Sequence, residues 1–318
     1  MFALSNKSKQ YLLVALKVLI LTFTFSYIYV KINQNDSINS FMFFYKTFTT
    51  KSIISILGFL CLAALNWFFE ILKWKTIIKT IKTISFFTAL KQSLASLTVS
   101  LATPNRVGEY GAKAYFFEKN NRKKVMLYNL YHNFFQMFIT CFLGVIGLFL
   151  FFSKHQINSF FIKLDLKLIV MILFTILIVS FIFRNQTLIF KGLTISNLIR
   201  KLKEIPKTIK LKILLYSFIR YCIFCFLFFQ LLHFFGAIIT LTEAIPCILS
   251  MYLLASIIPT LSLFDVVIKG GVAVWLFSVL GVSDIIVLST VFCMWILNFV
   301  FPSLIGAYFL ITYKPTYE

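Results

Sequence analysis

One short stretch of the sequence combines a proline, two bases and an acid in a pattern that could bind an anion. Thr103 before Pro104 predicts a helix N-cap with proline at the first helical position. In such a helix Arg106, Glu109 and Lys113 would share one face, with Glu before Lys at the favourable spacing of four residues. One positive charge is left over, and a helix N-terminus adds N–H donors for phosphate. The stretch therefore predicts an anionic headgroup site, unless it is a cytoplasmic loop whose charges are solvated.

A second stretch repeats the arrangement near the C-terminal end. Asp265 and Lys269 follow Pro259 with the same acid-before-base spacing, and they are the only charges between Glu243 and Asp284. A lone charge at the centre of a bilayer costs about 2.5–3.5 kcal/mol, so charges isolated in an apolar region indicate function by default. The alternative is a buried structural pair that holds two helices together.

Glycines accompany both stretches. Gly108 and Gly111 lie among the charges of the first, and Gly270 and Gly271 follow Lys269 in the second. Residues without a side chain let another backbone or a lipid headgroup come close. We expect these glycines, with the two prolines, to shape the breaks in the apolar segments.

Other polar residues are weaker candidates. Glu70 is expected at the inner end of a helix, where exposure to the interface explains it, and Arg220 is expected to extend to the cytoplasmic surface. His132 and Asn133 could face a cavity, but a packed polar contact is the preferred interpretation. The sequence contains no Ser-His-Asp set, metal-ligand cluster or Gly-Lys phosphate loop, so neither a cofactor nor a metal is predicted.

The composition indicates that these residues belong to a membrane protein. Of 318 residues, 60% are hydrophobic and 13% are charged, against about 45–50% and 25% in soluble domains. A water-facing surface of ordinary size cannot be built from so few charges, which excludes a soluble enzyme. The net charge is +21, but the bases lie between apolar blocks. They indicate topology and contacts with anionic lipids rather than a nucleic-acid partner.

The apolar blocks have the length of membrane-spanning helices, which need about 20 residues. We predict an all-α integral membrane protein with about eight membrane segments, in one polytopic domain over residues 1–318. Two of the segments are interrupted, at 86–118 and 244–282. The uninterrupted spans are predicted at 11–30, 52–72, 126–152, 166–183, 213–235 and 285–312.

Basic stretches at 73–91, 104–124 and 184–212 are expected in the cytoplasm, as are both termini. The first two flank one apolar segment, which must therefore dip in and return as a re-entrant hairpin near Pro104. The second half repeats this order upside down near Pro259, as in the inverted repeats of secondary transporters. The halves would be about 1–183 and 213–318, joined by a basic linker. The alternative is two ordinary proline-kinked crossings.

The pattern Pro104-x-Arg106-x-Gly108-Glu109, followed by a small and a basic residue, resembles the lysylphosphatidylglycerol synthase transmembrane region family. That family includes the flippase half of the multiple peptide resistance factor, and the resemblance covers about residues 10–312. It implies a bacterial inner-membrane protein with lipid-translocating or lipid-linked roles. The chain extends six residues beyond its last predicted span, so we expect no aminoacyltransferase activity. The family's second motif usually carries Pro-Gly-Gly and a later glutamate, where this chain has Asp265 and Lys269.

Together these observations predict binding or translocation of an anionic lipid in a cavity between two inverted halves. Arg106, Lys113 and Lys269 would attract the headgroup, while Glu109 and Asp265 would hold those bases or exchange protons. Two alternatives remain open. The chain could be an intramembrane enzyme acting on lipid-linked intermediates, with one of the two acids as acid or nucleophile. It could instead be a non-transporting partner of another membrane enzyme, or form homo-oligomers.

Overall fold

The computed structural model describes residues 50–101, 103, 106–155, 203–257 and 265–313, and the regular structure in these ranges is helical. The elements are α3 (Thr50–Ile78), α4 (Phe86–Leu101), α5 (Gly108–Tyr115), α6 (Lys119–Lys154), α9 (Lys207–Phe234), α10 (Leu241–Ile257), α11 (Asp265–Ser278), α12 (Asp284–Trp295), the π-helix η2 (Ile296–Val300) and α13 (Phe301–Thr312). The predicted all-α class is confirmed.

Four helical rods in the described part are long and apolar enough to cross a membrane: α3, α6, α9 and the continuous α12–η2–α13. They confirm the predicted spans at 52–72, 126–152, 213–235 and 285–312. The 36 residues of α6 measure about 54 Å, well beyond a hydrocarbon core of about 30 Å, so its charged first turns extend out of the membrane. The predicted spans at 11–30 and 166–183, both termini and most of the linker lie outside the described residues.

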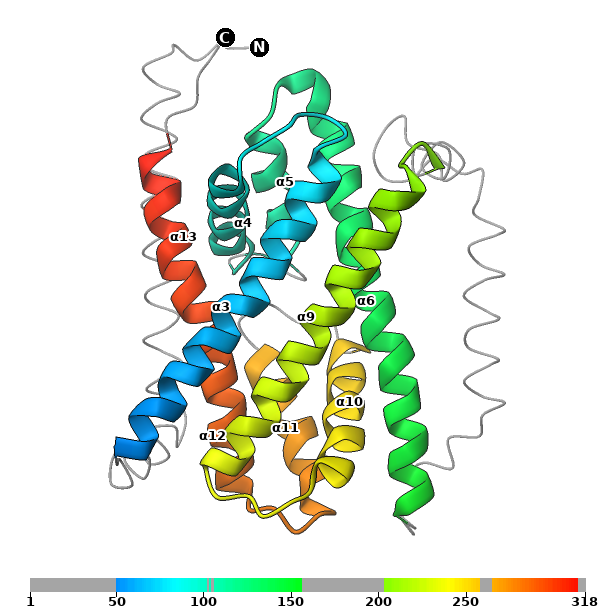
Figure 1. Ribbon diagram of the computed structural model, residues 1–318, viewed down its shortest axis with the longest axis vertical. Coiled ribbons are helices and arrows are strands. Elements are labelled where there is room, and N and C mark those ends of the chain that lie inside the picture. Colours follow the sequence, from blue (N-terminus) through cyan, green and yellow to red (C-terminus); the bar gives the residue numbers. More distant parts are fainter. Residues whose placement is uncertain (1–49, 102, 104–105, 156–202, 258–264, 314–318) are drawn as a thin grey trace.

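The two interrupted segments form pairs of short helices. The longest of them, α10, has 17 residues and measures about 26 Å, while α5 with eight residues measures about 12 Å. Neither length reaches across the core of about 30 Å. Figure 1 shows α4 and α5 together at one end of the bundle, and α10 and α11 together at the opposite end. This is the hairpin arrangement expected from the sequence, although Pro104 and Pro259 themselves lie outside the described residues.

The two halves are inverted copies of one arrangement. In Figure 1, α3 runs toward the end that holds the α4–α5 hairpin and α6 runs away from it, whereas α9 and α12–α13 run the opposite way around the α10–α11 hairpin. The helix contacts follow the same symmetry between the halves. Helix α6 packs on α10 as α13 packs on α4, and α3 packs on its counterpart α9. A long helix of each half therefore packs against the hairpin of the other half. Inverted repeats with interrupted helices are found in secondary transporters.

Glycines mark the places where a long helix crosses the hairpin of the other half. A Cβ atom added to Gly306 of α13 would collide with the carbonyl of Leu94 on α4. On α6, a Cβ added to Gly147 would collide with the side chain of Leu249 on α10. Backbones can approach this closely only where one helix lacks a side chain. The two crossings are thus built in the same way.

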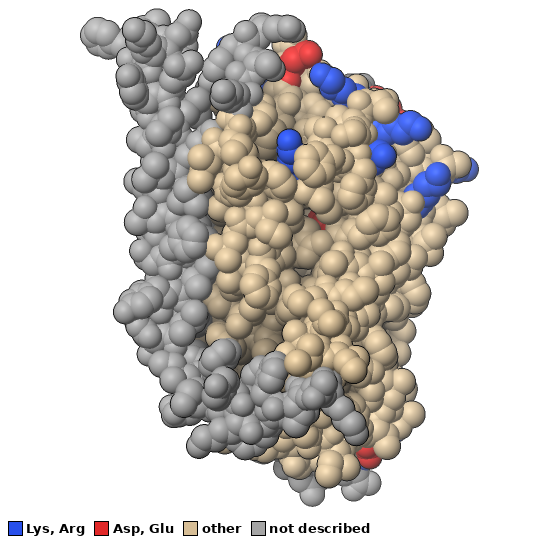
Figure 2. Space-filling model, turned by 60° about the vertical axis from the view of Figure 1, so that its left-hand side comes forward, with Lys and Arg blue, Asp and Glu red and all other residues tan. Residues whose placement is uncertain are grey.

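Basic side chains gather at one end of the bundle. Figure 2 shows Lys and Arg at the upper end of the face it displays, and below them the face is hollowed, with part of an acidic side chain visible inside. Along the chain, bases lie in the last turn of α3 and in the first turns of α6 and α9, the helix ends that Figure 1 shows at the α4–α5 end of the bundle. The opposite end has few charges in the described ranges, so the charge asymmetry predicted from the sequence is present in the fold.

Two local expectations were wrong. Helix α5 begins at Gly108, four residues later than an N-cap at Thr103 would place it. Thr103 still caps this helix, because its Oγ1 accepts the N–H of Gly108 at 2.8 Å. The Gly270–Gly271 pair does not break the second segment, since both residues lie inside α11, whose apolar packing tolerates the weak helix preference of glycine.

Candidate functional site

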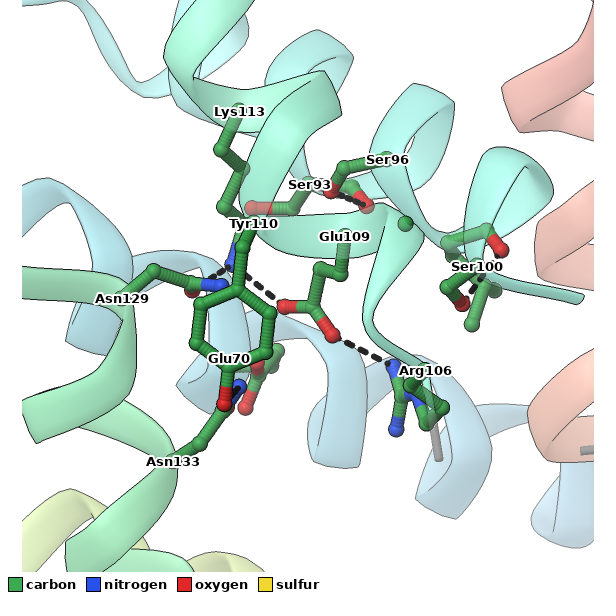
Figure 3. Close-up of polar contacts among 12 residues, drawn as sticks. Glu70, Ser93, Ser96, Ser100, Arg106, Glu109, Tyr110, Lys113, Asn129 and Asn133 are labelled. Atoms are coloured by element: carbon green, nitrogen blue, oxygen red, sulfur yellow. Dashed lines mark hydrogen bonds and ion pairs between the residues drawn. The ribbon is translucent and has the colours of Figure 1, made fainter. Parts of the chain in front are cut away.

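The charged residues of the first hairpin form a buried chain of ion pairs. Lys113 Nζ donates to Glu109 Oε1 at 2.7 Å, and a terminal nitrogen of Arg106 lies 3.2 Å from Glu109 Oε2 (Figure 3). Lys113 also donates to Asn129 Oδ1 on α6 at 2.9 Å. Glu109 and Lys113 are only 3% and 1% exposed, so these two residues do not belong to a solvated loop.

Lys113 is fixed by an aromatic residue as well. Its ammonium lies 4.4 Å from the ring centroid of Trp74 on α3, a contact worth about 2 kcal/mol or more once desolvated. The Trp74 indole N–H in turn donates to Gln92 Oε1 on α4 at 2.9 Å. Lys113 therefore contacts α3 and α6 directly, and Trp74 links it to α4.

Arg106 sits at the turn between the two helices of the hairpin, outside the helix that the sequence predicted for it. Its φ of 58° lies in the left-handed region, where a non-glycine residue costs about 1–3 kcal/mol and usually serves a function. Its side chain is 35% exposed, and the guanidinium lies 5.8 Å from the ring centroid of Phe299. Glycine would suit this backbone conformation better.

The second hairpin reaches the same ring. Lys269 Nζ on α11 lies 5.6 Å from the centroid of Phe299, so one base from each hairpin faces one phenylalanine of η2. Lys269 also lines a pocket whose other walls are mostly apolar. These walls are Phe224, Phe228, Met251, Tyr252, Val266, Val291, Met294, Trp295 and Phe299. The side chain of Asp265 lies outside the described residues, so its predicted pairing with Lys269 stays a prediction.

A second ion network lies beside the first, on spanning helices α3, α6 and α9. Glu70 Oε2 accepts from Arg220 at 2.6 Å and lies 3.1 Å from Lys73 Nζ. Lys73 and Arg220 both donate to Gln136 Oε1, at 3.3 and 3.4 Å. His132 Nε2 faces the other oxygen of Glu70 at 3.4 Å. Three helices from both halves are thus joined at one carboxylate.

An asparagine pair connects this network to η2. Arg220 Nε donates to Asn66 Oδ1 at 3.0 Å, and Asn66 Nδ2 donates to Asn298 Oδ1 at 2.7 Å. The indole N–H of Trp67 donates to the backbone carbonyl of Asn298 at 3.2 Å. A π-helix frees such backbone groups and is frequent at functional sites. It places Asn298 on the network and the next residue, Phe299, between the two hairpins.

Several expectations for single residues were wrong. Glu70 is 6% exposed and paired rather than exposed at the interface. Arg220 pairs with it instead of extending to the cytoplasmic surface. Lys73, counted among the cytoplasmic bases, is fully buried. The packed polar contact expected for His132 is confirmed. The signal that could have found the network is the charge of Arg220 in the middle of an apolar span, because such a charge needs a partner.

The four candidate glycines differ in what surrounds them. A Cβ added to Gly108 would lie 2.8 Å from Thr103 Oγ1 and 2.9 Å from the carbonyl of Val99, so this position admits no side chain. A Cβ on Gly270 would lie 3.2 Å from a Leu288 methyl group, whereas those on Gly111 and Gly271 would meet nothing within 4 Å. Only Gly108 of the four allows a close approach of backbone.

The chain was compared with protein families, curated proteins and solved structures. The family model described as lysylphosphatidylglycerol synthase TM region matches residues 13–306. No curated protein and no solved structure matches the chain. The matched range includes both hairpins, the two ion networks and η2.

Proposed function

We propose a function from one premise: the chain belongs to the lysylphosphatidylglycerol synthase TM region family. It is a multi-pass helical membrane protein. We infer that it binds an anionic lipid and carries it between leaflets, with the headgroup held where the two hairpins meet. We also propose that the basic end and both termini face the cytoplasm of a bacterial cell, because short basic segments remain on that side of the inner membrane.

The observation that supports this proposal most strongly is the pair of bases at Phe299. Arg106 and Lys269 come from hairpins at opposite ends of the bundle, yet each lies within 6 Å of the same ring centroid. A phosphate between them would be charge-paired from both sides. The phosphate could also stay bound to the base of one hairpin while it dissociates from the base of the other. Movement between leaflets requires such a transfer.

The surroundings suit the rest of a lipid. Lys269 lies at a pocket whose other described lining residues are aromatic, aliphatic or Met. Ligand sites of this kind combine apolar walls with a few placed polar groups. A small free anion would gain nothing from such walls, whereas the glycerol and first methylenes of a lipid would be desolvated by them.

The test is lipid movement in reconstituted vesicles. A fluorescent phosphatidylglycerol in the inner leaflet is protected from dithionite until the protein exposes it. We expect Arg106→Gly and Lys269→Ala each to slow this exposure about ten- to a hundredfold, because a hydrogen bond to a charged group contributes about 1.5–3 kcal/mol. Arg106→Gly removes the base while keeping a backbone that favours positive φ.

Lys91→Ala is the matched control. Lys91 also lies over aromatic rings, 4.8 Å from Phe87 and 5.9 Å from Phe309, but on the outer side of α4. It should leave the rate unchanged. Equal rates for the wild-type chain, both site variants and protein-free vesicles would contradict the proposal. A lipid extract that gains a new product would instead favour the intramembrane enzyme.

A further inference from the structure

The imidazole of His132 is buried with one ring nitrogen unpartnered. The residue is 0% exposed, and its Nδ1 lies 3.0 Å from Asn133 Oδ1. In the orientation that the structure gives to this amide, Oδ1 can only accept, so Nδ1 carries the proton. Asn133 Nδ2 is used elsewhere, since it donates to the hydroxyl of Tyr110 at 3.4 Å. Nε2 has no hydrogen-bond partner among the described residues.

This nitrogen faces a carboxylate oxygen of Glu70. Oε2 of Glu70 receives both Arg220 and Lys73. Oε1 lies 3.4 Å from His132 Nε2. A neutral ring with its proton on Nδ1 turns a lone pair toward a carboxylate, which is unfavourable. One proton on Nε2 would convert the contact into a charge-assisted hydrogen bond.

The charges around the ring explain why that proton would need a counter-ion. The charged groups that act on it are Glu70 and Lys73 on α3 and Glu109 and Lys113 on α5. Arg220 on α9 and Arg106 at the hairpin turn are paired to the two carboxylates. Four bases against two acids leave a surplus of two positive charges, and a protonated ring would raise it to three. An anion that enters among these bases offsets one charge.

We propose that His132 is a proton site whose filling is coupled to the binding of an anionic headgroup. The proposal rests on the lipid-binding function above. When the phosphate binds near Arg106 and Lys269, Nε2 takes up one hydronium proton from the aqueous solution, conducted by water that enters with the headgroup. The ring becomes an imidazolium paired with Glu70 Oε1. When the phosphate leaves, the proton returns to water, so one proton accompanies each headgroup.

The first experiment reads the ring directly. The chain has three histidines, and the other two, His155 and His233, lie at helix ends with partial or full exposure. In micelles at about pH 6.5, where an unperturbed histidine is half protonated, nitrogen-15 NMR separates their signals, and His132→Gln assigns the buried one. We expect dihexanoyl phosphatidylglycerol to at least double the protonated share of that signal.

Dihexanoyl phosphatidylcholine and inorganic phosphate are the comparison arms. A response to phosphate as well would identify a general anion site, and an unchanged signal in all three arms would overturn the proposal.

The second experiment uses the vesicle assay. An inward and an outward pH gradient should change the rate of headgroup exposure in opposite directions by about tenfold per pH unit, the limit for one coupled proton. His132→Gln should remove this dependence, and His233→Gln should keep it. Lipid movement that ignores the gradient in the wild-type chain would overturn the coupling and leave the proposed function standing. If the chain moved no lipid but the His132 signal still responded to the lipid, the proposed transport function would be contradicted and the protonation of His132 on headgroup binding would stand.

Discussion

The two hairpins share a fold and differ in chemistry. In α4–α5 the charges are paired inside the protein, with Glu109 and Lys113 almost completely buried. In α10–α11 the described charges are Glu243, which caps its helix at the exposed end through Thr240, and Lys269 at the pocket. The inverted repeat therefore places the two hairpins in equivalent positions. Their side chains differ, so only the first hairpin carries a buried ion pair among the described residues. In the first hairpin the described ion pair is buried, whereas in the second Lys269 lines a mostly apolar pocket.

Among variants that test this difference between the hairpins, we expect the largest loss of stability at Glu109. Glu109→Gln leaves Lys113 buried without a carboxylate, and removing one partner of a buried pair costs about 3–5 kcal/mol. The midpoint of thermal unfolding in detergent measures this loss.

A compensating variant sharpens the prediction. Replacing both partners, Glu109→Gln with Lys113→Met, removes the unpaired charge and keeps an apolar stem on Trp74, so it should unfold at a higher temperature than Glu109→Gln alone. A double variant as unstable as the single one would show that the charges are not a pair.

The glycine at the crossing of α13 and α4 should give a smaller loss. Gly306→Ala forces a methyl group into the carbonyl of Leu94, and overpacking of this kind costs about 1–3 kcal/mol. Gly111→Ala is the matched control on α5, because its methyl group would meet nothing within 4 Å and alanine favours the helix. Equal unfolding midpoints for the two variants would contradict the close crossing.

The smallest effects compare the two helix caps. Thr103→Val removes the acceptor for the N–H of Gly108 and should cost about 1 kcal/mol. Thr240→Val at the second hairpin should cost less, since its hydroxyl bond to Glu243 is exposed and water replaces it. Hydrogen exchange of the first turns of α5 and α10 measures both, and a greater loss of protection in α10 than in α5 would reverse the comparison.

Much of this architecture could be predicted from residue type alone. Apolar runs of spanning length and the side on which the bases lie required a hairpin near Pro104, and local spacing required Glu109 to meet Lys113. The Glu70–Arg220 pair could not be read in this way, because 150 residues separate the partners. Phe299 is one of forty phenylalanines, and only the packed helices distinguish it. Spacing reveals neighbours along one helix, whereas contacts between halves depend on how the repeats are placed.

The central claim is that the two hairpins meet at Phe299, and the most direct test is proximity in the membrane. In a variant without the six native cysteines, Arg106→Cys and Lys269→Cys should be joined by a short bifunctional thiol reagent in native membranes. The pair Lys91→Cys and Lys269→Cys is the control and should stay unlinked. The account predicts efficient linkage of the first pair, slowed by added phosphatidylglycerol. Linkage no greater than in the control pair would mean that the two breaks do not share a site.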